Sequence, residues 1–202
     1  MLKAQREMLE EQANVRQDIG ALHGMYRRQH EDFGRFRGNY AIDATRRNEG
    51  DIALLFSKSS AHGFNRISMR DFSQADINDF LSENYDAIDA LGLRERAWNT
   101  FLKGDIIARV TEVMGNTPGF YLAVEASYTA DIEDLRRAVD HAKMLRCAGD
   151  LAAYAVVAGV RKNSSVEGPL YDDVEEFIGA QDEDSALWFP LDLKDVQPDD
   201  PF

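Results

Sequence analysis

The chain has 202 residues, a mass of 22.8 kDa and a formal net charge of -13. This length accommodates one well-buried domain with an additional segment, because domains typically contain about 100–150 residues. No apolar run approaches the roughly 20 residues of a membrane-spanning helix, and the N-terminus is charged from residue 3 without an apolar signal core. We therefore expect no membrane association and a cytoplasmic protein.

The single cysteine, Cys147, excludes an intramolecular disulfide and a cysteine-cluster metal site. Alanines and leucines surround it in the sequence, so a packing role is expected. The histidines lack the ligand spacing of a zinc site; they are His23, His30, His62 and His141. Any metal ion in this protein is therefore expected to be a hard cation held by carboxylates.

A seven-residue pattern of apolar side chains runs from Met1 to Phe36 and predicts a coiled coil. One seam position holds Met1, Met8, Val15, Leu22 and Phe36, and the other holds Ile19, Tyr26 and Phe33. Glutamines interrupt both positions, so the helix needs a second copy or the domain surface to pack against. We expect a homodimer through this helix. Gly34 and Gly38 predict a break or bend before a second helix that covers residues 39–56.

Three parts are expected: the N-terminal helix (1–36), a domain (37–192) and an acidic tail (193–202). Residues 57–65 predict a loop, because small and polar residues predominate there. The segment 68–98 begins with helix-capping residues and then repeats apolar residues at helical spacing, which predicts a helical insert of one or two short helices.

Negative charge is concentrated in residues 171–202, which hold eleven acids and one lysine. No basic patch typical of a nucleic-acid-binding protein is evident, and the locally basic segment 27–37 is interpreted as a solvated helix face. The acidic segment is either solvated or directed at a basic protein surface. Within it, the apolar stretch 186–193 predicts a last strand or a docked segment, and residues 197–202 are expected to be disordered.

The middle of the chain alternates strand and helix patterns. Residues 104–113 and 120–128 predict a hairpin, because both are rich in β-forming residues and a turn sequence separates them. Asp131 is a helix cap, and the helix predicted over 131–148 stops at Gly149. The apolar run 151–160 is typical of a strand covered on both faces, and a helix between two strands favours a parallel crossover. The chain is therefore expected to be α/β.

Glu125 is an acid inside an apolar strand, where an unpaired charge would cost several kcal/mol. Alternation places Ser127 on the same face, and the hairpin brings Asp105 within reach. Two carboxylates and a main-chain carbonyl form a reasonable Mg²⁺ site. The alternatives are a salt bridge from Glu125 to Arg109 and a strand-start cap for Asp105. A tight turn centred near 116–117 would place residue 105 opposite residue 128, so the site requires a bulge or bend.

The segments "GDIIARV" and "YLAVEAS", followed by "DIEDLRRAVDHAKMLRCAG" and "VVAG", resemble the PD-(D/E)XK nuclease superfamily. The resemblance covers residues 36–160 and is closest to a branch in which a coiled coil precedes the domain and the acidic strand reads "VEVS". It implies a restriction-endonuclease-like core, a mixed sheet flanked by helices, which here follows a long N-terminal helix or coiled coil.

The resemblance also assigns roles to residues. Asp105 and Glu125 match the two metal-binding acids, and Ala126 would contribute its carbonyl oxygen to Mg²⁺ or Mn²⁺. Ser127 stands where active members have a lysine that orients the attacking water and offsets phosphate charge; a hydroxyl does neither well. Asp43 gives a weak match to a further acid on the first helix.

Two functions follow from this interpretation. The favoured one is a nuclease-like domain that has lost catalysis and serves as a dimeric binding module, with a protein partner and with nucleic-acid binding left open. It accounts for Ser127 and for the acidic surface. The alternative is an active Mg²⁺-dependent endonuclease that uses Asp105 and Glu125, with Lys103 or Lys143 in place of the missing lysine.

Overall fold

The computed structural model describes residues 2–93, 95–115, 117–149, 151–163, 166 and 170–192; within the first helix it describes the side chains of residues 16, 19–29 and 32 onward. The chain forms two compact units, residues 1–39 and residues 40–202. The acidic tail expected at 193–202, including the disorder expected at its end, lies outside the described residues.

Helix α1 (Leu2–Lys58) passes through Gly34 and Gly38 without ending, so the break expected there is wrong. A glycine inside a helix costs about 1 kcal/mol relative to alanine, which weakens a helix but does not end it. Neither glycine adopts the left-handed conformation that commonly terminates a helix. The part of α1 in the second unit buries one face, formed by Ala41, Ala44, Ile52, Ala53 and Phe56.

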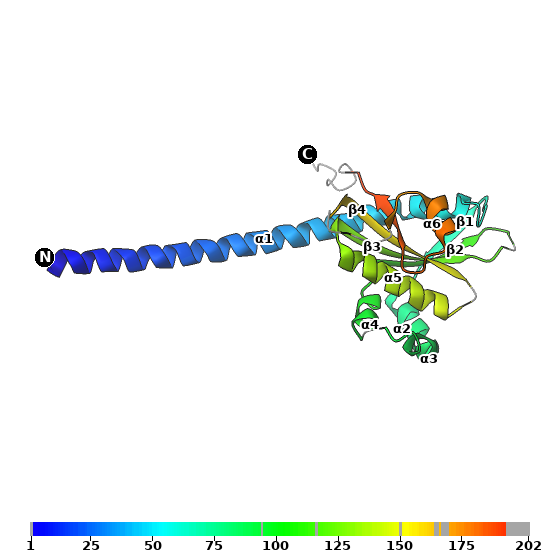
Figure 1. Ribbon diagram of the computed structural model, residues 1–202, viewed down its shortest axis with the longest axis horizontal. Coiled ribbons are helices and arrows are strands. Elements are labelled where there is room, and N and C mark those ends of the chain that lie inside the picture. The colour runs from blue at the N-terminus through cyan, green and yellow to red at the C-terminus, as the bar shows by residue number, and fades with distance from the viewer. Residues whose placement is uncertain are drawn as a thin grey trace. The chain divides into compact units, whose positions relative to one another are not determined.

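The second unit contains a mixed six-stranded sheet with the strand order β1-β2-β3-β4-β6-β5 (Figure 1). The strands are β1 (Ile67–Asp71), β2 (Ile106–Glu112), β3 (Phe120–Ala130), β4 (Ala152–Lys162), β5 (Leu170–Tyr171) and β6 (Ala186–Pro190). The first three strands form an antiparallel meander, whereas β4 and β6 continue the sheet in parallel with β3. The expected α/β architecture with a mixed sheet is therefore confirmed.

Helices cover both faces of the sheet, so the domain has two hydrophobic layers. One layer packs the sheet against α2 (Gln74–Glu83), α3 (Tyr85–Asp89), α4 (Glu95–Phe101) and α5 (Ile132–Cys147), which lie together on one side in Figure 1. The other layer packs it against the C-terminal part of α1 and against α6 (Val174–Ala180).

Helix α5 is the crossover between the parallel strands β3 and β4, as predicted from the sequence. It begins with a capping box: the Asp131 carboxylate accepts hydrogen bonds from the backbone of Glu133 and Asp134, and Asp134 accepts from the backbone of Asp131. The apolar stretch expected to form a last strand is β6, which pairs with β4.

The segment expected to be a helical insert (68–98) begins instead with strand β1, and only its later part is helical. Strand β1 lies at the edge of the sheet and pairs antiparallel with β2, with Met69 opposite Val110. An edge strand with two apolar residues has a weak pattern of its own, because the hydrogen bonds that hold it come from its neighbour. The predicted loop at 57–65 also starts slightly late, because α1 continues to Lys58.

Candidate functional site

The β2–β3 register brings the two candidate metal-binding acids together. Ile106 lies opposite Val124, and continuing this antiparallel register by one residue places Asp105 opposite Glu125. Pairing is regular from 106 to 110, so the displacement that a tight turn centred near 116–117 would cause is absent and the paired residues need no bulge to bring Asp105 opposite Glu125. The connection between β2 and β3 is longer than a tight turn, because β2 ends at Glu112 and β3 begins at Phe120. It includes Met114 in a left-handed conformation, and Gly119 packs against the Val110 carbonyl, where an added Cβ would lie 2.2 Å from the oxygen.

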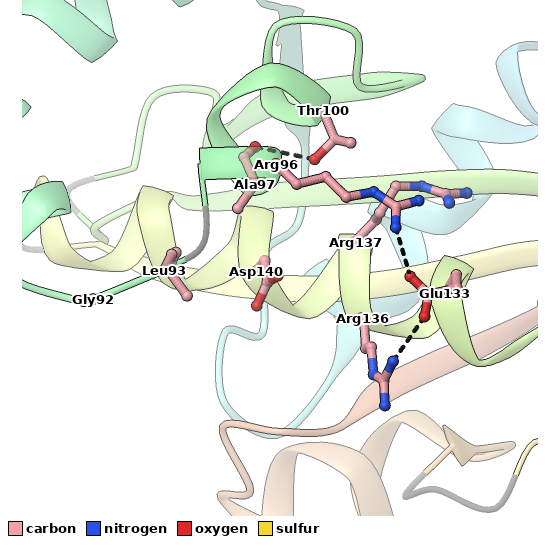
Figure 2. A pocket seen from close by; sticks show the side chains of 9 residues that line it. All are labelled: Gly92, Leu93, Arg96, Ala97, Thr100, Glu133, Arg136, Arg137 and Asp140. Carbon is pink, nitrogen blue, oxygen red and sulfur yellow. Dashed lines mark hydrogen bonds and ion pairs between the residues drawn. The ribbon is translucent and has the colours of Figure 1, made fainter.

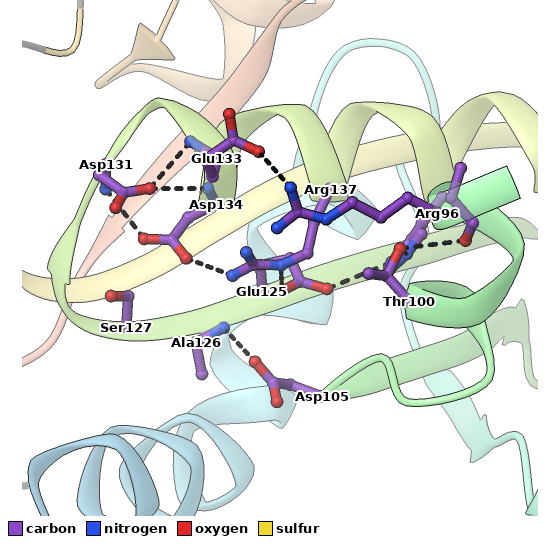
Figure 3. A network of polar contacts seen from close by, with 12 residues as sticks. Arg96, Thr100, Asp105, Glu125, Ala126, Ser127, Asp131, Glu133, Asp134 and Arg137 are labelled. Carbon is purple, nitrogen blue, oxygen red and sulfur yellow. Dashed lines mark hydrogen bonds and ion pairs between the residues drawn. The ribbon is translucent and has the colours of Figure 1, made fainter. Parts of the chain in front are cut away.

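Glu125 is buried, with only 5% of its side chain exposed, and its charge is compensated by helix α5 (Figure 3). The Arg137 Nε donates to Glu125 Oε2 at 2.7 Å, and a second nitrogen of the same guanidinium bonds to Asp134. The salt bridge to Arg109 considered above is therefore wrong, because Arg109 is exposed on β2 opposite Tyr121. The acid in the apolar strand is explained by a partner on the following helix.

His141 completes the surroundings of Glu125 from one turn further along α5. Its side chain is 1% exposed, and its Nδ1 lies 3.2 Å from Glu125 Oε1, within ion-pair distance but without hydrogen-bond alignment. The Thr100 hydroxyl donates its proton to the Ala97 carbonyl, so the 3.1 Å contact with His141 uses Nε2–H as the donor. Only a second proton on Nδ1 would let His141 donate to Glu125.

Glu125 Oε1 is consequently a buried oxygen without a hydrogen-bond partner among the described residues. Buried polar atoms are normally satisfied, and leaving a charged one unpaired is costly. Either a protonated His141 or a bound cation would supply the missing interaction.

Asp105 is half-buried, and its Oδ2 accepts a hydrogen bond from the backbone nitrogen of Ala126 at 2.8 Å (Figure 3). Burial and the nearby charge of Glu125 raise the pKa of Asp105 to about 6, although the Ala126 hydrogen bond and Arg137 act in the opposite direction. Asp105 is therefore bonded to the neighbouring strand, whereas a strand-start cap would bond to its own strand.

Asp105, Glu125, Asp134, Arg137 and His141 form what we call the Glu125 cluster. Burial also affects the pKa values of its members Asp134 and Arg137. Desolvation raises the pKa of Asp134, and hydrogen bonding from the Asp131 backbone opposes the rise. Burial lowers the pKa of Arg137, but Glu125 and Asp134 more than compensate, so this group stays positively charged. With Asp105, Glu125 and Asp134 ionised, three carboxylates face one guanidinium, and the cluster is negative unless a further cation or proton is present.

Of the other residues that the sequence suggested, the structure keeps Ser127 near Glu125 and Asp134. The Ser127 hydroxyl donates to the Thr129 carbonyl in its own strand, and its proximity to the Asp134 carboxylate also lowers the pKa of Asp134. Lys143 pairs with Asp184, and Lys103 is exposed, so neither is among the described contacts of Glu125. Asp43 is exposed on α1 and is not hydrogen-bonded to Asp105 or Glu125 among the described residues. The cation that contacts Glu125 is Arg137.

A polar pocket of about 380 Å³ lies beside this cluster, between α4 and α5 (Figure 2). Arg96 and Arg136 approach Glu133 in it, with nitrogen–oxygen distances of 3.5 and 2.7 Å. Arg137 of the Glu125 cluster lines this pocket, as does Thr100, which contacts His141 of the same cluster. Part of the Arg137 side chain therefore borders this pocket, whereas Glu125 itself stays buried.

The residues present fit a divalent cation only in part. Glu125 Oε1 offers one vacant oxygen, and the excess of carboxylates would favour a positive ion there. Among the described residues, however, no group of three or more His, Cys, Asp or Glu side chains is arranged to hold a metal. Because Arg137 already bonds the other oxygen of Glu125, a metal held by Asp105 and Glu125 would have to displace it or share the site with it.

Arg137 and His141 were missed in the sequence, although a signal for them exists. Asp134, Arg137 and His141 follow one another at helical spacing on the helix that directly follows the Glu125 strand. A buried acid requires a compensating charge, and the first element that folds back over its strand is the natural place to find one.

No family model, no curated protein and no solved structure matches this chain. Among the described residues, none of the helices combines the length and the apolarity that crossing a bilayer requires.

Proposed function

We propose that residues 37–192 form a restriction-endonuclease-like domain of the PD-(D/E)XK type that does not hydrolyse phosphodiester bonds and acts as a dimeric binding module. The N-terminal part of α1 is its dimerisation arm. The element order supports this proposal. A helix is followed by a three-stranded antiparallel meander, a crossover helix and a parallel strand; the strands form a mixed sheet, and helices flank it.

The observation that carries the loss of catalysis is the Arg137–Glu125 ion pair. The Arg137 guanidinium bonds one oxygen of Glu125, the acid that would bind the metal. It carries one positive charge, whereas a nuclease would have a divalent ion bound to this acid. A divalent ion polarises the phosphate and generates a nucleophile from water, and a guanidinium does not lower the pKa of a bound water in this way.

Ser127 supports the same conclusion, because it stands at the position where an active nuclease of this type is expected to have a lysine. The position of the expected lysine carries a hydroxyl whose proton is donated to Thr129 within β3. One well-placed electrostatic group is worth on the order of 10²–10³ in rate, so its loss together with a blocked metal site would remove detectable hydrolysis.

A second candidate function rests on a separate observation: Glu125 Oε1 has no hydrogen-bond partner among the described residues, and the charge of Glu125 raises the pKa of Asp105. If Mg²⁺ or Mn²⁺ binds there, Asp105, Glu125 and the Ala126 carbonyl would hold it, and the ion would supply the activated water of an endonuclease. The chain's own contribution would then be to orient the carboxylates, with Arg137 moved off Glu125.

Mn²⁺ titration calorimetry separates the two candidates. The degenerate module predicts weak binding by the wild-type protein, stronger binding by Arg137→Met because one carboxylate oxygen is released, and no binding by Asp105→Ala or Glu125→Ala. Arg136→Met, which removes the adjacent and more exposed arginine, is the matched control and should bind like wild type. Tight wild-type binding that is unaffected by Arg137→Met would favour the endonuclease.

A gain-of-function assay tests the position of the missing lysine. The double variant Ser127→Lys, Arg137→Met should show slight Mg²⁺-dependent nicking of plasmid DNA if the domain is a degenerate nuclease. A double variant with no activity despite demonstrated Mn²⁺ binding would count against a nuclease-like ancestry of this site.

A further inference from the structure

A row of exposed apolar side chains follows one face of α1 within residues 1–39. Their exposed fractions lie between 50% and 69%, and they belong to Ile19, Leu22, Met25, Tyr26, Phe33 and Phe36. Met25, Phe33 and Phe36 also border a shallow groove on this helix, together with Asp32. A contiguous exposed apolar row on a helix is typical of an interaction surface.

The helix itself requires a partner. Gly20, Gly24, Gly34 and Gly38 lie within it, and each costs about 1 kcal/mol relative to alanine. A Cβ added at any of them would meet nothing within 4 Å, so none is explained by close packing within the described structure. The glycines lower the intrinsic stability of this helix, and most helical stability in proteins comes from packing of an apolar face against a partner.

We propose that this segment pairs with a second copy of the chain as a parallel, in-register coiled coil. The inference rests on the dimerisation arm of the proposed function and adds its orientation. In the heptad abcdefg, Ile19, Tyr26 and Phe33 occupy position a, and Leu22 and Phe36 occupy position d. The four glycines all fall at b and f, which face away from the seam.

Charge complementarity selects the parallel orientation. Asp32 occupies position g and Arg37 occupies the next position e, and in a parallel pair these two positions face each other across the seam. The same order recurs in two earlier heptads, with Glu11 at g before Arg16 at e and Asp18 at g before His23 at e, whereas Met25 occupies g in the heptad between them and Asp32.

An antiparallel pair would bring e against e and g against g, so that bases would face bases and acids would face acids. Like charges across the seam are destabilising, whereas opposite charges set partner and orientation. The Arg37 guanidinium also lies 5.7 Å from the Phe33 ring, which holds its stem along the seam. A second copy in parallel is therefore the occupant that the surface fits best.

Parallel pairing also determines at which end of the coiled coil the two domains are attached. Residues 40–202 follow the C-terminal end of the segment, so parallel pairing attaches both domains to the same end of one coiled coil. A dimeric ligand, or two sites on one long ligand, would then be bound with the gain in apparent affinity that linked sites provide. Antiparallel pairing would attach the domains to opposite ends.

Charge-swapped variants of the full chain test the orientation by sedimentation equilibrium. Asp32→Arg and Arg37→Asp each place like charges at two symmetry-related contacts, and each alone should weaken dimerisation by about 10- to 50-fold. An equal mixture of the two restores both contacts and should form a heterodimer of near wild-type affinity. Arg35→Asp is the matched control, because it changes the net charge as Arg37→Asp does but lies at the outward position c.

Disulfide trapping provides an independent readout. In a Cys147→Ser background, Leu22→Cys should form an intermolecular disulfide under mild oxidation, because equivalent d positions face each other only in a parallel, in-register pair. A wild-type dimer with no response to the charge swaps and no disulfide at residue 22 would overturn the parallel orientation alone. A wild-type monomer at micromolar concentration would overturn both this inference and the proposed dimerisation arm.

Discussion

Removal of the Arg137 guanidinium is the perturbation that most sharply tests how the Glu125 cluster is held. In Arg137→Ala, the buried Glu125 carboxylate loses its 2.7 Å hydrogen bond, and Asp134 loses its ion pair with the same side chain. Three carboxylates then share a poorly solvated site without the arginine.

The magnitude follows from burial. Glu125 is 5% exposed and Arg137 is 28% exposed, so solvent replaces little of the lost interaction. Breaking a buried pair by removing one partner costs about 3–5 kcal/mol. For a domain of this size, about 2–4 °C of melting temperature is lost per kcal/mol, which predicts a fall of roughly 6–20 °C.

Urea unfolding followed by circular dichroism measures this free energy. Arg136→Ala is the control, because Arg136 is more than half exposed and its pair with Glu133 is worth less than about 1 kcal/mol. The double variant Glu125→Gln, Arg137→Ala should regain much of the lost stability, since the uncompensated charge is then absent.

The loss in Arg137→Ala should also depend on pH. Arg137 lowers the pKa of Asp105, so its removal raises that pKa further above the unfolded value. A carboxyl with a raised folded pKa favours folding when protonated, and this contribution disappears as pH rises through the folded pKa. The difference from wild type should therefore be largest near pH 8 and should shrink as the pH falls toward about 6, where Asp105 becomes protonated in both proteins. Equal losses for Arg137→Ala and Arg136→Ala, or a loss independent of pH, would refute the buried-pair account.

Two further predictions concern the same strands. Asp105→Asn should raise the unfolding free energy by roughly 2–3 kcal/mol at pH 8 and by nothing near pH 4, because the pKa of Asp105 is raised to about 6 and its ionisation opposes folding; pH-dependent urea denaturation checks this. Gly159→Ala should cost about 1–3 kcal/mol, because the added Cβ would lie 2.6 Å from the Ser127 carbonyl oxygen. Gly179→Ala, whose Cβ meets nothing within 4 Å, should be neutral or slightly stabilising in the same thermal melts, and equal effects of the two changes would contradict the packing argument.

Local signals in the sequence were sufficient for the centre of the fold. The Asp131 cap and the apolar stripe of the following helix define α5, and the apolar run before residue 160 defines β4. Strand β1 was missed, because its alternation of apolar and polar residues extends only from Ile67 to Arg70 and is too short to oppose the helix pattern that follows. Its pairing with β2 is a tertiary property, which a local pattern does not contain.

The sequence indicates which two acids belong to the candidate site, but it does not predict how they are arranged in space. Asp105 and Glu125 were chosen from strand position, yet whether they face each other depends on the hairpin register, which the length of the connecting loop sets. The partner of Glu125 lies twelve residues away on a different element. Glu125 pairs with Arg137 and not with Arg109 because of how α5 packs on β3. The sequence pattern of a single strand does not contain information on that packing.

The most direct test of the account is a nuclease assay on the wild-type protein with supercoiled plasmid DNA and with RNA, in the presence of Mg²⁺ or Mn²⁺. For the degenerate nuclease proposed above, we expect both substrates to remain uncut, because Arg137 bonds Glu125, the proposed metal-binding acid, and residue 127 is a serine instead of the proposed catalytic lysine. Metal-dependent cleavage by the wild-type protein that is abolished in Glu125→Gln would contradict this proposal and would identify the domain as an active endonuclease.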